Sequence, residues 1–208
     1  GRAMSGKAVV VTGSTGIAAA TAHRLVARGH RVSPRADQRD VAMTAPRRLA
    51  GFCFDHMHMG DLLGKALRSD AYEVVGVYDT QLERMAEVCA DLGIGDALQF
   101  TDWLTLIEST RPEVAVVCST TAEHTDWVER LASRGIHVLL EKPFAVSAEE
   151  ARRAIDLAEQ HGVALCVNWP LAWFATHRTT QRLVAEGAIG ELLEVHYYDG
   201  NRGPQFHQ

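Results

Sequence analysis

Two histidines lie just after an apolar run that predicts a buried strand. In AGFCFDHMHMGDLL (Ala50–Leu63), Asp55, His56 and His58 separate this run from an amphipathic segment. Imidazole and carboxylate groups can bind a metal ion, and they can also hydrogen-bond a phosphate or a hydroxyl group. No further ligand follows at a recognisable spacing, so we predict no metal here. We expect the turn to contact a cofactor phosphate or the substrate, and a purely structural turn is the alternative.

An acidic residue ends the next apolar run, YEVVGVYD. Asp79 follows the histidine turn by roughly 20–30 residues, where a Rossmann fold places the carboxylate that hydrogen-bonds the adenosine ribose. A carboxylate there repels the 2′-phosphate of NADP, so NAD is the expected cofactor. Arg84, one turn later, keeps NADP open as the alternative. Asp79 could instead only cap the helix that follows, a role that Thr80 could also fill.

A lysine stands near the end of another apolar run, HVLLEKP (His137–Pro143). Pro143 prevents the strand from continuing freely, which places Lys142 at the carboxyl end of a parallel strand. Ligands of open α/β sheets bind at this edge. An ammonium group there can stabilise alkoxide charge that develops as a carbon gives up hydride. From the residues alone, a surface pair of Lys142 with Glu141 is the alternative.

A glycine turn of a different kind lies near the N-terminus. Gly13 and Gly16 separate a strand-like run from a helix-like one, where backbone amides could meet a pyrophosphate. TGSTGIA resembles the short-chain dehydrogenase turn T-G-x-x-x-G-x-G over about Lys7–Val32, but one residue is missing and Ala18 replaces the last glycine. No tyrosine has the lysine four residues on that this family needs. We therefore expect an appended, inactive βα segment, and short-chain dehydrogenase activity ranks third among the functions.

Alternating strand-like and helix-like runs must position these groups. Thr80 with Glu83 and Ser147 with Glu150 predict capping boxes at two helix starts. The expected strands are AVVVTG, RLAGFCF, YEVVGVYD, LQF, EVAVVCST, HVLLEKP and VALCVNW. The expected helices are Ile17–Arg28, Gly60–Arg68, Leu82–Leu92, Asp102–Ser109, Ala122–Ser133, Ala148–His161 and Thr176–Glu186. Several strands are apolar nearly throughout, which predicts an α/β fold: a doubly wound Rossmann sheet of parallel strands with helices on both faces.

Composition excludes several classes of function. The 208 residues are 47% apolar and 23% charged, with a formal net charge of −5, so no nucleic-acid partner is expected. No apolar run approaches the roughly 18 residues of a membrane span, so no membrane partner is expected either. The four cysteines contain no C-x-x-C pair, which favours a reduced, cytoplasmic protein.

A polar, proline-containing segment, Ser33–Arg48, breaks the alternation and predicts a linker. We place a boundary within it. The expected organisation is an appended βα segment with its linker (1–42), a dinucleotide-binding domain (43–170) and the beginning of a second α/β domain (171–208).

From about Arg47 onward the chain resembles the oxidoreductases of the glucose–fructose oxidoreductase, inositol dehydrogenase and MocA family (Gfo/Idh/MocA). The resemblance is carried by HVLLEKP followed by a capped helix, and by motifs after three strands. The fourth strand of this family ends in T-P-x-x-x-H, its fifth in Glu-Lys-Pro, and an asparagine follows its sixth. The matching residues are Ser119, Thr120, His124, Glu141, Lys142, Pro143 and Asn168.

This resemblance implies an NAD(P)-dependent oxidoreductase that transfers hydride between nicotinamide and a hydroxyl of a sugar- or polyol-like substrate. Lys142 is then the catalytic residue, and NAD is the cofactor, with NADP as the alternative. The expected cofactor-binding residues are Gly51, Phe54, His56, His58, Asp79, Ser119, Thr120, His124, Glu141 and Asn168.

Two features depart from the family pattern. The first turn lacks G-x-G-x-x-G, so we expect the histidine turn to be the dinucleotide turn in an unusual form. AEGAIGELLEVHYYDG resembles the entry into the second domain, and the chain ends at Gln208 after the first strand expected there, before the family's downstream aspartate and histidine. The second hypothesis is therefore a truncated, non-catalytic nucleotide-binding or interaction protein. The edge of an incomplete domain would also favour self-association into a homo-oligomer.

Overall fold

The computed structural model describes residues 45–170 and 174–196. The chain divides into two compact units, Gly1–Asn168 and Trp169–Gln208. The predicted appended segment, with its glycine turn at Gly13, lies outside the described residues. No helix of the described part is long and apolar enough to cross a membrane.

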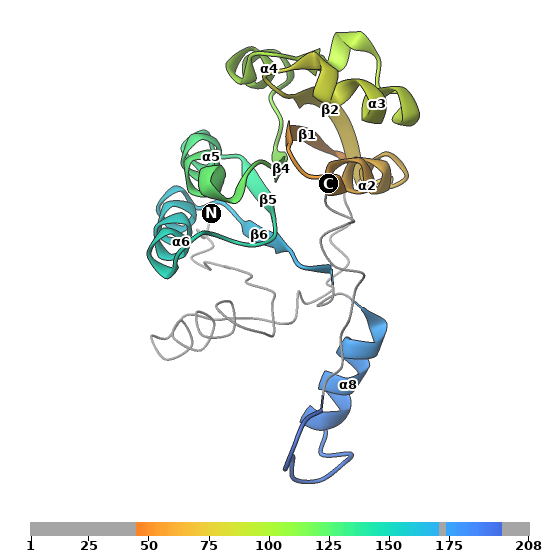
Figure 1. Cartoon of the computed structure of the whole chain (residues 1–208), viewed down its shortest axis with the longest axis vertical. Helices are drawn as coiled ribbons and strands as arrows, with labels where there is room; N and C mark the ends of the chain where they lie inside the picture. Colours follow the sequence, from red (N-terminus) through yellow and green to blue (C-terminus); the bar gives the residue numbers. More distant parts are fainter. Residues whose placement is uncertain (1–44, 171–173, 197–208) are drawn as a thin grey trace. The chain divides into compact units, whose positions relative to one another are not determined.

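The first unit contains a six-stranded sheet in the order β3-β2-β1-β4-β5-β6 (Figure 1). All five strand pairs are parallel. This order is that of the doubly wound Rossmann fold, so the predicted fold class is confirmed. The strands are β1 (Arg47–Phe54), β2 (Tyr72–Tyr78), β3 (Gln99–Phe100), β4 (Val114–Cys118), β5 (His137–Glu141) and β6 (Leu165–Asn168).

Helices connect successive strands, and their bounds agree closely with the periodicity of the sequence. Leu82–Leu92 and Ala148–His161 begin and end where they were expected. The helices of this unit are α2 (His58–Leu67), α3 (Leu82–Leu92), α4 (Trp103–Thr110), α5 (His124–Ala132) and α6 (Ala148–His161), with short 3-10 helices at Asp96–Leu98 and Thr121–Glu123.

Both faces of the sheet are covered, as adjacent residues of one strand show. Val77 of β2 packs in a buried cluster with Met59 and Leu63 of α2. A Cβ at the neighbouring Gly76 would lie 3.3 Å from Leu106 of α4. Because successive residues of a strand point to opposite faces, α2 and α4 cover different faces. The apolar strands are thus buried on both sides, which the nearly continuous apolar runs predicted.

The Ser147 cap of one predicted capping box is confirmed, and the Thr80 cap of the other is wrong. The Ser147 hydroxyl accepts a hydrogen bond from Glu150 N at 3.1 Å. At α3, by contrast, the N-cap is Gln81, and no side chain caps it. The helix begins one residue too late for Thr80 to be its N-cap, and the Thr80 hydroxyl donates to Asp79 Oδ1 at 3.3 Å.

The described part of the second unit contains α8 (Ala175–Ala185), one residue from the predicted bounds at each end. Apolar side chains after it are exposed, and Leu193 is the most exposed of them at 86%. Residues 191–196 form no strand, so the described part of the strand expected there is wrong. The rest of that run lies outside the described residues.

Candidate active site

Since all six strands are parallel, their carboxyl ends meet along one edge of the sheet. β1 lies between β2 and β4, and the order of the strands reverses beside it. Ligands of open α/β sheets bind in the crevice at such a point. The predicted site residues at or just beyond this edge are Phe54, His56, His58, Asp79, Ser119, Thr120, His124, Glu141, Lys142 and Asn168.

Gly51 lies inside β1, before the end of the strand. A Cβ at this position would stand 3.1 Å from Met59 Sδ and 3.3 Å from Leu63 Cδ2, closer than ordinary van der Waals contact. Glycine therefore lets α2 pack against the sheet here. The contact of Gly51 with a cofactor stays a prediction, and the structure gives the residue a packing role.

The last residues of β1 include an unusual backbone at Cys53, one residue before the strand ends. Its φ is 66°, in the left-handed region that glycine adopts without strain. The register between β1 and β4 shifts at this point, between Phe52 and Phe54. Burial raises the pKa of the Cys53 thiol, and the nearby carboxylates of Asp55 and Asp79 raise it further. The thiol is therefore protonated near neutral pH and is no candidate nucleophile.

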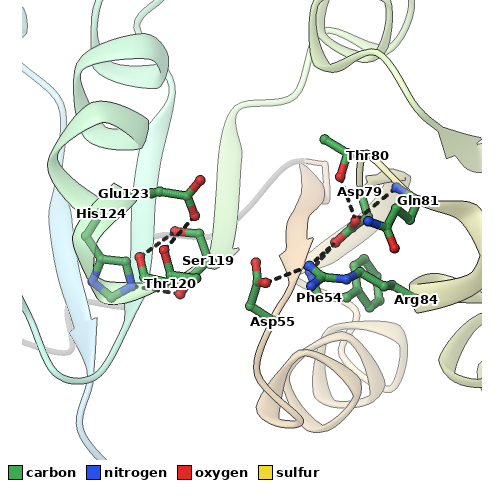
Figure 2. Close-up of polar contacts among 10 residues, drawn as sticks. All are labelled: Phe54, Asp55, Asp79, Thr80, Gln81, Arg84, Ser119, Thr120, Glu123 and His124. Carbon is green, nitrogen blue, oxygen red and sulfur yellow. Dashed lines mark hydrogen bonds and ion pairs between the residues drawn. The ribbon is translucent and has the colours of Figure 1, made fainter.

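Asp79 ties the end of β1 to the start of α3 (Figure 2). The carboxylate is 2% exposed. Phe54 N donates to Oδ2 at 2.8 Å, and Gln81 N donates to Oδ1 at 3.1 Å. Each carboxylate oxygen has two acceptor positions, so these bonds leave capacity for a ribose hydroxyl. Asp79 thus has a structural role, and its ribose contact stays a prediction.

Arg84 lies beside this carboxylate and is paired with a second one. Its Nη1 is 2.6 Å from Asp55 Oδ1 and 3.9 Å from Asp79 Oδ2 (Figure 2). The hydrogen bond to Asp55 is the main cause that raises the pKa of Arg84, and the charge of Asp79 adds to it. The pair of Arg84 with Asp55 had no signal in the sequence, because 29 positions separate the two residues.

A second polar group follows β4 (Figure 2). His124 is buried at 1% exposure, and its two ring nitrogens lie 3.2 Å from the Ser119 carbonyl oxygen and 3.1 Å from that of Phe144. The Thr120 hydroxyl donates to Glu123 Oε2 at 2.7 Å. His124 therefore connects the turn after β4 to the segment after β5. The cofactor contacts expected of Ser119, Thr120 and His124 stay predictions.

A third group joins the histidine turn to the ends of β5 and β6. Glu141 is 1% exposed, and its Oε1 lies 2.9 Å from His58 Nδ1. Its Oε2 accepts a hydrogen bond from Asn168 Nδ2 at 2.7 Å. Lys142 Nζ lies 3.8 Å from Glu141 Oε1 and 3.2 Å from His56 Nε2. Five of the predicted site residues thus form one network. The sequence named all five but paired only Lys142 with Glu141.

The turn itself is closed by backbone bonds to His56. His58 N donates to the His56 Nδ1 atom at 3.2 Å, and Met59 N donates to the His56 carbonyl oxygen at 3.1 Å. Two amides at the start of α2 are therefore already bonded within the turn. A glycine turn leaves such amides to a pyrophosphate, so this turn presents fewer of them.

The first unit is similar to known oxidoreductases. Residues 53–169 match the Gfo/Idh/MocA model, an oxidoreductase family with an NAD-binding Rossmann fold. A 1,5-anhydro-D-fructose reductase from Ensifer adhaerens is 37% identical over 135 residues, 64% of this chain and 39% of that protein. An inositol 2-dehydrogenase from Pseudomonas fluorescens (strain SBW25) is 35% identical over 125 residues, 60% of this chain and 37% of that protein.

The fold is also similar to that of solved structures. The structure of an inositol dehydrogenase homologue from Azotobacter vinelandii, complexed with NADH and myo-inositol, gives a TM-score of 0.63 at 22% identity. This likeness covers 72% of our chain and 41% of that one. The chain spans 39% and 37% of the length of the two relatives named above.

Proposed function

Since the chain belongs to the Gfo/Idh/MocA oxidoreductase family with an NAD-binding Rossmann fold, we propose that it binds NAD for hydride transfer. The reacting group is a hydroxyl of a sugar- or polyol-like substrate, the class in the names of the anhydrofructose and inositol relatives. The observation that carries the proposal is the Lys142 ammonium at the carboxyl edge of β5, beside the buried Glu141 carboxylate.

Lys142 is the proposed catalytic residue. Its side chain is 29% exposed, so it reaches solvent while two partners hold it, Glu141 and His56. A bound nicotinamide supplies or accepts the hydride. In reduction, the ammonium donates a hydrogen bond and then a proton to the substrate oxygen on which negative charge develops. In oxidation the steps reverse, and the neutral amine of Lys142 accepts the hydroxyl proton as the hydride leaves. Asn168 and His58 orient Lys142 indirectly, because both hold the Glu141 carboxylate.

We propose that Asp79 contacts the adenosine ribose and that NAD is preferred over NADP. The carboxylate lies at the end of β2, where a Rossmann fold binds the ribose hydroxyls. Arg84 is the group that could attract a 2′-phosphate, but it already pairs with Asp55 at 2.6 Å. A phosphate would have to share Arg84 with that carboxylate and also approach the charge of Asp79. These costs support NAD as the cofactor.

The proposal is tested by comparing binding and turnover in Lys142→Met. NADH and NADPH affinities are measured by calorimetry, and turnover is measured with NAD and a panel of inositols and hexoses. We expect NADH to bind the variant within about threefold of the wild type, and turnover to fall by about 10²–10³, the typical effect of losing one charge-stabilising donor. The matched control is Lys65→Met, on an exposed position of α2.

Two results would contradict these assignments. Near-normal turnover of Lys142→Met would refute the catalytic assignment of Lys142. Tighter binding of NADPH than of NADH would refute the proposed preference for NAD. NADH binding without turnover of any substrate in the panel would instead favour the non-catalytic, nucleotide-binding alternative.

We further propose a cytoplasmic protein that self-associates. All four cysteines are unpaired, which is usual in a reducing compartment. The apolar side chains exposed after α8 offer a contact surface. They are Ile189, Leu192, Leu193 and Val195. Light scattering of the wild type and Leu193→Glu tests this, because a charge there should lower the measured mass if that surface makes the contact.

A further inference from the structure

Three side chains with metal-ligating atoms converge where the histidine turn meets β5. His56 and His58 have ring centroids 4.3 Å apart, and Glu141 reaches them from the end of β5. One ligating atom from each residue lies within 4.8 Å of the other two. The sequence shows only the two histidines together, and the structure supplies the third ligand from 83 residues away.

Two imidazoles and one carboxylate are the ligands of a zinc site that keeps its fourth position open. With bonds of about 2.1 Å, two ligand atoms on a tetrahedral ion lie roughly 3.4 Å apart. The separation of His58 Nδ1 and Glu141 Oε1 is 2.9 Å, and all three ligating atoms lie within 4.8 Å. Side-chain shifts of about 1 Å would therefore bring the set to zinc geometry.

The second observation is that a cation, the Lys142 ammonium, already lies at this place. Glu141 is buried at 1% exposure, and a buried carboxylate needs a positive or hydrogen-bonding partner. The Lys142 ammonium now faces two of the three ligands, 3.2 Å from His56 Nε2 and 3.8 Å from Glu141 Oε1. Asn168 holds the other carboxylate oxygen at 2.7 Å, as an outer partner of a metal ligand does.

From this geometry we propose that His56, His58 and Glu141 bind a divalent ion of the zinc class, in competition with the Lys142 ammonium. The proposal goes beyond the dinucleotide function and does not depend on it. Lys142 can give way, since its side chain is 29% exposed and has a flexible four-carbon stem. The open coordination position would take water or a substrate oxygen.

The cysteines of the described residues do not compete for the ion. Burial raises the pKa of each thiol, and a protonated thiol is a poor metal ligand. These residues are Cys53, Cys89, Cys118 and Cys166.

The test is a calorimetric titration of the tag-free, chelator-stripped 208-residue chain with zinc chloride in a non-coordinating buffer. We expect one equivalent of zinc to bind, and magnesium not to compete, because magnesium prefers oxygen ligands. His58→Gln and Glu141→Gln should each weaken binding by at least about 10–100-fold, the loss found even for outer partners. Lys142→Met should bind zinc more tightly than the wild type, because the competing charge is gone.

The matched control is His161→Ala, at an exposed position where α6 ends, which should bind zinc like the wild type. Melting temperatures without metal show whether each variant is folded. Where Glu141→Gln does not fold, Asn168→Ala replaces it, with about a 10–100-fold weakening expected.

The proposal is overturned if the wild type binds no zinc. It is also overturned if folded His58→Gln and Glu141→Gln bind zinc with wild-type affinity. Weaker zinc binding by Lys142→Met overturns the competition. A parallel NADH titration separates the two proposals: NADH binding without zinc binding overturns the metal site alone, and zinc binding without NADH binding overturns the dinucleotide function alone.

Discussion

The Asp79→Asn substitution should lower both the stability of the fold and the affinity for the dinucleotide. The size of each effect can be estimated from the contacts of the carboxylate. Phe54 N donates to one oxygen and Gln81 N to the other, at 2.8 and 3.1 Å. Asparagine has one oxygen, so one backbone N–H must face its amide NH₂. The loss of a hydrogen bond to a charged acceptor costs about 1.5–3 kcal/mol, and at 2% exposure water cannot easily replace it.

The effect on stability is measured by urea unfolding followed by tryptophan fluorescence. Trp127 is a suitable probe, because it is 3% exposed and its ring centroid lies 5.6 Å from that of Tyr78, next to Asp79. With a slope of about 2–3 kcal/mol per molar urea, the midpoint should fall by about 0.5–1.5 M. Asp91→Asn, on an exposed position of α3, is the control and should unfold at the wild-type midpoint.

The same variant tests the ribose contact. In buffer without urea, where Asp79→Asn is still folded, its NADH dissociation constant should rise at least about tenfold, which corresponds to about 1.4 kcal/mol. A lower midpoint with unchanged NADH affinity would leave Asp79 a purely structural residue. An unchanged midpoint would refute the reasoning from its backbone hydrogen bonds.

Three smaller effects follow from local geometry. Because Cys53 has a φ of 66°, Cys53→Gly should be about 1–2 kcal/mol more stable than Cys53→Ala, and equal melting temperatures would contradict the strain. Ser147→Ala removes the cap of α6 and should lower the unfolding free energy by about 1 kcal/mol, measured in urea. Burial raises the pKa of all four thiols, so few thiolates exist in the folded protein until the pH rises far above neutral. Ellman's reagent at pH 8 should therefore label the cysteines slowly before unfolding, and rapid labelling would contradict this.

The sheet and its helices could be predicted because their signals are local. The apolar run of β2 and the amphipathic period of α6 each lie within one short segment, and the structure reproduces both. The prediction that Thr80 caps α3 was wrong because it, too, used only the local pattern. Thr80 has the local pattern of a cap, but Asp79 is buried by the fold and takes both the Thr80 hydroxyl and the Gln81 amide.

The site was predictable residue by residue, but its contacts between distant residues were not. Each parallel strand ends at the same edge, so groups such as Lys142 could be placed there from the strand alone. The bond between His58 and Glu141 joins residues 83 positions apart, and no spacing in the sequence predicts such a pair. The left-handed backbone of Cys53 was also unpredictable, because a residue with a Cβ disfavours that conformation.

The histidine turn differs from a glycine turn in the groups that it presents. Glycines have no side chains, so the backbone amides of a glycine turn can hydrogen-bond the phosphates. Here the His56 ring and carbonyl oxygen take two amides at the start of α2, while the imidazoles of His56 and His58 reach Lys142 and Glu141. The turn therefore contributes side chains to the end of β5, where the chemistry of Lys142 is proposed. A Rossmann unit built this way connects its first turn directly to the proposed catalytic lysine, so substitutions at His56 or His58 should alter turnover more than NADH affinity.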